Sequence, residues 1–136
     1  MYATKRILVV DDEDGIRRLI ARALTKAGYA VESACDGDDA LETFCNGGKF
    51  DLIVSDVRMP GISGPRLVEK LRRVEADVKV LYITGYADQL FSEREMLWED
   101  EAFLDKPFTT PGLLESVSLM VYGHTSPPPD SPPPTA

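Results

Sequence analysis

Residues 51–64 read DLIVSDVRMPGISG, and the rest of the 136-residue chain is organised around them. The apolar run at 52–54 is too short for a helix and leads at once into turn residues, so it predicts a buried strand. A proline and two glycines disfavour a helix directly after it. Asp56 therefore lies at the strand's carboxyl end, where ligands collect in open parallel sheets. Alone, an Asp there is more often a turn former than a reactive group.

Three other apolar runs also end in polar side chains, and together they change the interpretation of Asp56. The runs at 7–10, 80–83 and 102–104 lead into Asp11-Asp12, Thr84-Gly85 and Asp105-Lys106. If the strands are parallel neighbours, these groups converge on one edge of a sheet. Close carboxylates repel one another, and a hard divalent cation such as Mg2+ relieves that repulsion. A cation, a lysine and a hydroxyl around one carboxylate would form a receptor for a phosphoryl group.

Composition places the chain among single globular domains. Its 136 residues can bury one sizeable core, and its 43% hydrophobic content is ordinary. The net charge of -8 argues against a nucleic-acid surface, which would need a basic patch. No apolar run approaches a membrane span and the N-terminus has no signal-peptide pattern, so we expect a cytoplasmic protein. Cys35 and Cys45 lack metal-site spacing, and we expect both to be partly or fully buried thiols without a disulfide.

Strands and helices alternate along the chain. Strands are predicted at 5–10, 30–33, 52–54, 78–83 and 102–104, and apolar residues at helical spacing follow each of them. Five strands joined by five helices through short, right-handed connections predict a doubly wound α/β sandwich. The expected buried helix faces include Leu19, Cys45 and Val74. Asp14 is expected to cap the first helix and Gly28 to end it.

The second half of the chain is less regular. Four basic residues of the third helix are expected to form a solvated face, and 86–101 is expected to be a short or irregular fourth helix. Trp98 in that segment would either cap the core or anchor a partner. Thr109 or Thr110 should cap the last helix. The basic face comprises Arg66, Lys70, Arg72 and Arg73.

A change of composition marks the end of the domain, which we place at 1–123. Residues 124–136 are rich in proline and have no large apolar side chain, so they predict a disordered tail. His124, the chain's one histidine, lies in this tail and is not expected to be catalytic.

Taken in order, these motifs resemble the receiver domain of two-component response regulators over about residues 4–122. The matching features are the pair Asp11-Asp12, Asp56 with Met59-Pro60 and Gly64, Thr84-Gly85, and Lys106-Pro107-Phe108. The runs at 83–87 and 105–109 look most like receivers of hybrid histidine kinases, and single-domain regulators also fit. The resemblance implies a flavodoxin-like fold with a parallel five-stranded sheet in the order 2-1-3-4-5.

The resemblance also implies the chemistry of the site. Asp56 would accept a phosphoryl group from a phosphohistidine on a histidine kinase or a histidine phosphotransfer protein. Mg2+ would be bound by Asp12, Asp56 and the backbone carbonyl of Arg58, with Asp11 helping through water. Lys106 would pair with a phosphoryl oxygen, and the Lys106-Pro107 peptide bond would be cis.

Signalling would depend on residues around the acceptor. The resemblance implies that the Thr84 hydroxyl follows the phosphoryl group inward and that Phe103 is the switch aromatic; ordinary core packing is the alternative for Phe103. Gly85 would leave room for the phosphoryl group, and the Arg58 side chain would tune its hydrolysis. Phosphorylation would change the surface near residues 86–122. Formation of a phosphorylation-dependent homodimer is one outcome of that change.

Two other classes of function compete with this interpretation. A metal-dependent phosphohydrolase with an Asp nucleophile usually has a second acid two residues later, where this chain has Arg58. A flavin-binding or purely protein-binding module on the same fold would not need Lys106 with the acid pair. We therefore expect a signalling module, acting alone, in a relay or within a hybrid kinase, that catalyses only its own phosphorylation and dephosphorylation.

Overall fold

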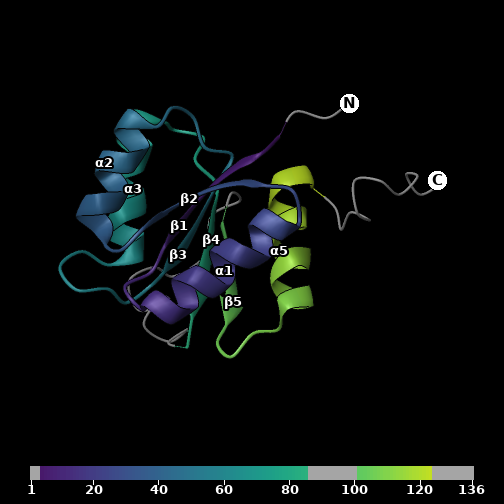
Figure 1. Ribbon diagram of the computed structural model, residues 1–136. Coiled ribbons are helices and arrows are strands. Elements are labelled where there is room, and N and C mark those ends of the chain that lie inside the picture. The colour runs from purple at the N-terminus through teal and green to yellow at the C-terminus, as the bar shows by residue number, and fades with distance from the viewer. Residues whose placement is uncertain (1–3, 86–100, 124–136) are drawn as a thin grey trace.

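A computed structural model of the chain describes residues 4–85 and 101–123. Its five strands form one sheet in the order β2-β1-β3-β4-β5, and every neighbouring pair is parallel (Figure 1). This is the strand order that the sequence resemblance implied. The strands are β1 (Arg6–Val10), β2 (Ala30–Ala34), β3 (Leu52–Asp56), β4 (Val80–Thr84) and β5 (Glu101–Asp105).

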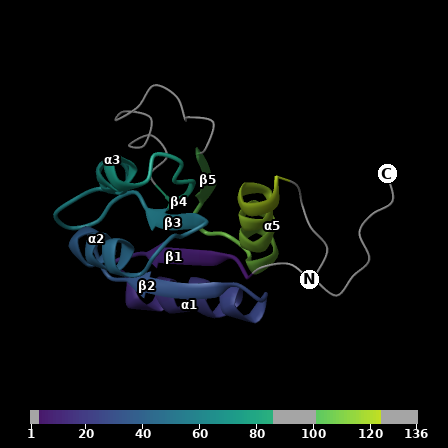
Figure 2. The same cartoon turned by 90° about the horizontal axis from the view of Figure 1, so that it is seen from above.

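Within residues 4–85 and 101–123, four helices cover the two faces of the sheet. They are α1 (Asp14–Lys26), α2 (Gly37–Asn46), α3 (Gly64–Val74) and α5 (Thr110–Tyr122). Figures 1 and 2 show α2 and α3 together on one face and α1 with α5 on the other. None of the helices in the described ranges has the length and apolar character that a membrane span requires.

The central strands are buried on both faces, which explains their unbroken apolar runs. Because side chains alternate along a strand, Ile7 and Val9 of β1 pack toward α1 and α5. Leu8 and Val10 pack toward α2 and α3 on the other face. Two hydrophobic cores therefore hold the strand ends in register beneath the predicted site.

Side chains cap three of the four helices that the structure describes, and Thr109, one of the two residues predicted to cap the last helix, is among them. The side chains of Asp36, Ser63 and Thr109 each accept a hydrogen bond from the backbone N–H three residues later, as N-caps do. The prediction for α1 was wrong by one residue, because Glu13 occupies the N-cap position and Asp14 is the first helical residue. Gly28 follows the C-cap Ala27 with a φ of 102°, a conformation that suits glycine.

Several burial predictions were wrong. Leu19 is 51% exposed and Val74 is 62% exposed. Leu19 precedes the buried Ile20 by one position, a turn of about 100° that takes it off the sheet-facing side. Val74 is the last residue of α3. Cys35 and Cys45 are both exposed free thiols, and Cys45 follows Phe44, which occupies the buried position instead.

Arg72 is not part of a solvated face, contrary to prediction. Its guanidinium lies 2.8 Å from the Glu101 carboxylate and donates to the backbone carbonyl of Val78. Glu101, expected in the fourth-helix segment, is the first residue of β5, and its side chain is fully buried beside Tyr82. The remainder of that predicted helix, Trp98 and the predicted tail at 124–136 lie outside the described residues.

Candidate phosphoryl-acceptor site

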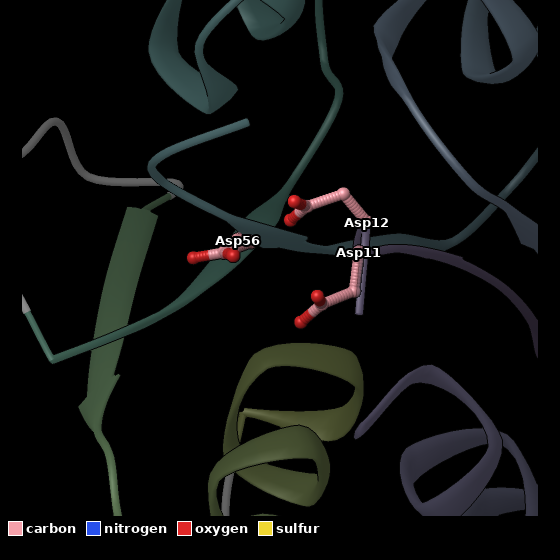
Figure 3. A group of neighbouring side chains, drawn as sticks. All are labelled: Asp11, Asp12 and Asp56. Carbon is pink, nitrogen blue, oxygen red and sulfur yellow. The ribbon is translucent and has the colours of Figure 1, made fainter. Parts of the chain in front are cut away.

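The carboxyl ends of β1 and β3 deliver three aspartates to one place. Strand order reverses between these neighbours, and ligand sites in doubly wound sheets form at such reversals. Asp11 and Asp12 directly follow β1, and Asp56 is the last residue of β3. Figure 3 shows their carboxylates beside one another, and one oxygen from each lies within 4.8 Å of the others. The predicted convergence of the acid pair on Asp56 is therefore confirmed.

Lys106 brings the nearest cationic charge that the structure records for this cluster. Its Nζ lies 3.5 Å from Asp56 Oδ2, 3.7 Å from Asp11 Oδ2 and 3.8 Å from Glu13 Oε1. Its backbone N–H donates to the carbonyl of Thr84 at 2.9 Å, which ties the residue after β5 to the end of β4. The Lys106-Pro107 peptide bond is cis, as the resemblance implied.

Burial and mutual repulsion perturb the two inner acids. Asp56 is 5% exposed, and its pKa is raised to about 6, first by burial and then by the Asp11 charge. Lys106 opposes that rise. Burial also raises the pKa of Asp11, and the Glu13 N–H and Lys106 counteract it in part. The site thus concentrates negative charge that a cation would stabilise.

Asp11 shows most directly that the cluster can accept a cation. Its Oδ1 accepts a 2.9 Å hydrogen bond from the Glu13 N–H, and its backbone carbonyl accepts one from the Arg17 guanidinium at 2.9 Å. Its Oδ2 is buried and has no hydrogen-bond partner within the described part of the chain. A buried carboxylate oxygen without a donor, beside two further carboxylates, matches the oxygen ligands that Mg2+ prefers.

The loop after β3 packs tightly against the backbone of Asp56. The Gly64 N–H donates to the Val57 carbonyl at 2.9 Å, and the Ser55 hydroxyl donates to the Asp56 carbonyl at 2.9 Å. A Cβ at position 64 would lie 2.3 Å from the Asp56 carbonyl oxygen. Only glycine allows this close approach, so the motif's Gly64 serves to position Asp56.

The remaining predicted residues lie on β4, on β5 and in the segments that follow β3 and β4. Thr84 is fully buried at the end of β4. Phe103 is 36% exposed on β5, so the alternative that it is an ordinary core residue is wrong. Arg58 is exposed beyond Asp56. A Cβ at Gly85 would make only an ordinary 3.8 Å contact with the Lys106 Cβ, so the neighbouring side chain leaves space at position 85.

Glu13 and Arg17 were missed as site residues. The sequence there predicted only a helix cap, because acids at a helix start usually stabilise that end of the helix. Arg17 lies one helical turn after Glu13, and this spacing could have indicated that its side chain reaches back to the acid loop.

The response regulator receiver domain family matches residues 7–118. The chain belongs to this family. Sensor kinase CckA of Brucella abortus is 39% identical over 85% of this chain and 12% of its own length. The response regulator receiver protein CpdR of the same organism is 32% identical over 86% of this chain and 97% of its own length. Both classes of receiver that the sequence resembled, those of hybrid kinases and single-domain regulators, are thus represented.

Solved structures agree with the fold of this receiver domain. The receiver domain of the hybrid histidine kinase CckA superposes with a TM-score of 0.72 at 38% identity, covering 85% of this chain and 98% of that one. The response regulator TrrA of Thermotoga maritima, solved in complex with Mg2+-BeF, gives a TM-score of 0.75 at 35% identity, covering 86% and 99%. The chain spans a small part of sensor kinase CckA and 41% of the probable transcriptional regulator ycf27 of Cyanidium caldarium.

Proposed function

We propose that this receiver domain takes a phosphoryl group onto Asp56 from a phosphohistidine of a histidine kinase or a histidine phosphotransfer protein. One observation supports this most strongly: the Asp56 carboxylate is buried beside two other acids and 3.5 Å from the Lys106 ammonium. The carboxylates outnumber the lysine, so the site can take a divalent cation beside Asp56, and that cation would offset the charge of an incoming phosphoryl group.

The transfer needs no general base. A carboxylate oxygen of Asp56 forms the new P–O bond while the P–N bond to the donor imidazole breaks. The electron pair of that bond stays on the imidazole nitrogen, which then takes up a proton. Asp56 must be ionised to attack, and a pKa of about 6 leaves it largely ionised above neutral pH.

Asp11, Asp12, Asp56 and the backbone carbonyl of Arg58 would hold Mg2+, with Asp11 contributing through water. The donorless Oδ2 of Asp11 and the 4.8 Å carboxylate cluster support this assignment. When bound, Mg2+ supplies positive charge that offsets the charge gathering on the phosphoryl oxygens. Lys106 would pair with one of those oxygens as a compact point charge.

Thr84 and Phe103 would report the phosphorylation to the rest of the molecule. Thr84 ends the strand next to β5, and Phe103 pairs in register with Tyr82 of β4. A hydroxyl drawn toward the phosphoryl group would shift the end of β4 against β5, where Phe103 is part-exposed. We infer that the surface near residues 86–122 carries this signal to a partner or a second copy. The domain would catalyse only its own phosphorylation and dephosphorylation.

Phosphorylation by acetyl phosphate with Mg2+ tests the proposal. The parent should gain one phosphoryl group by intact-mass spectrometry, Asp56→Ala should gain none, and the exposed control Asp77→Ala should match the parent. An equal mass gain in Asp56→Ala would show that another residue is the acceptor. Continued turnover of a small phosphate ester, in place of a single stoichiometric addition, would instead favour a phosphohydrolase.

A further inference from the structure

Glu13 brings a third carboxylate within ion-pair distance of the Lys106 ammonium. Its Oε1 lies 3.8 Å from Lys106 Nζ, almost as near as the carboxylates of Asp56 and Asp11 at 3.5 and 3.7 Å. Those two aspartates are buried, whereas the Glu13 side chain is 61% exposed. Glu13 therefore lies at the solvent side of the site and is not one of the three clustered acids.

The backbone of Glu13 is fixed with respect to the acid pair. Its N–H donates to Asp11 Oδ1 at 2.9 Å, and its carbonyl accepts the first helical hydrogen bond of α1 from the Arg17 N–H at 2.9 Å. The Arg17 guanidinium also donates to the Asp11 carbonyl, so the same helical turn holds both residues. These hydrogen bonds at the start of α1 therefore hold the Glu13 backbone in a fixed position near Lys106.

The side chain of Glu13 does not have the usual role of its position. At the N-caps of α2, α3 and α5, a side-chain oxygen accepts a hydrogen bond from the helix backbone. Glu13 is the N-cap of α1, and its carboxylate makes no such bond. Its recorded side-chain interaction is the ion pair with Lys106.

We propose that Glu13 is a positioning residue that restrains phosphorylation of the domain. This inference rests on the proposed function of Asp56. The Lys106 ammonium must turn toward a phosphoryl oxygen during transfer, and a lysine offers its charge to only a few partners at once. Glu13 competes with the phosphoryl group for that ammonium. Its negative charge at the solvent side also repels the anionic donor as it approaches.

The substitution Glu13→Gln tests this role, because it keeps the size of the side chain and removes the charge. We expect phosphorylation by acetyl phosphate, at saturating Mg2+ and low salt, to become about two- to fivefold faster, the range typical of an exposed ion pair. The gain should shrink toward none in about 0.5 M salt, where exposed charges are screened. A purely structural role for Glu13 would not produce this salt dependence.

Asp38→Asn is the matched control. Asp38 is an exposed acid in the first turn of α2, which starts at the same edge of the sheet, and its substitution removes the same charge. It should leave the rate at that of the parent. An unchanged or slower Glu13→Gln, or an equal acceleration in Asp38→Asn, would overturn the role of Glu13 while leaving Asp56 as the acceptor. A parent that takes up no phosphoryl group would overturn both proposals.

Discussion

Asp56→Asn should stabilise the folded domain at neutral pH, even though it removes the proposed acceptor. Burial and the Asp11 charge raise the Asp56 pKa from 3.8 to about 6, so ionising this carboxyl is harder in the folded chain than in the unfolded one. The difference of about two pKa units corresponds to about 3 kcal/mol, at ~1.4 kcal/mol per unit. Asparagine has the shape of the neutral acid and avoids this cost.

The pH dependence has a definite sign. Between pH 3.8 and about 6 the folded domain binds more protons at Asp56 than the unfolded chain does, so rising pH lowers the free energy of unfolding of the parent. The advantage of Asp56→Asn should therefore be below about 1 kcal/mol at pH 4 and should reach its full size above neutral pH.

Urea unfolding of the parent and Asp56→Asn at pH 4 and pH 7.5, without Mg2+, would measure this difference. The exposed control Asp77→Asn should stay within about 0.5 kcal/mol of the parent at both pH values. A destabilised Asp56→Asn, or an advantage of the same size at both pH values, would refute the claim that burial and repulsion hold the acceptor in an unfavourable charged state.

Three further predictions concern the surroundings of the acceptor. Gly64→Ala should lower the free energy of unfolding by roughly 1–3 kcal/mol and slow phosphorylation, because its Cβ would overlap the Asp56 carbonyl oxygen; unchanged urea unfolding would contradict this. Arg72→Met should cost about 3–5 kcal/mol by leaving the buried Glu101 charge without its guanidinium, and adding Glu101→Gln should recover part of the loss in urea unfolding. Arg58→Ala should change the rate at which the phosphorylated domain loses its phosphoryl group, measured by intact mass over time; equal rates would reject a role for this side chain.

Much of the site could be predicted because it follows from strand ends. Asp11, Asp56 and Lys106 each come just after or at the end of an apolar run, and parallel strands bring such ends to one edge. Glu13 could not be recognised in this way, because its partner Lys106 is 93 residues away and the helix start offered a sufficient local explanation. The helical spacing of apolar residues also predicted that Leu19 and Val74 are buried, and both are exposed. The part of each helix that contacts the sheet is narrower than the stripe of apolar side chains on that helix.

The amino-acid sequence by itself determined the alternation of strands and helices, the position of Asp56 at a strand end and the edge of the sheet at which the acids and Lys106 meet. These features depend on the spacing of apolar residues and on the residues that form turns. Both are properties of residues close together in the chain, so the sequence shows them directly. Tertiary structure alone decided the distances around Lys106, the raised pKa of Asp56 and the buried pairing of Arg72 with Glu101. Each of these arises from side chains on different elements, whose separation and loss of water are set only when the helices pack onto the sheet.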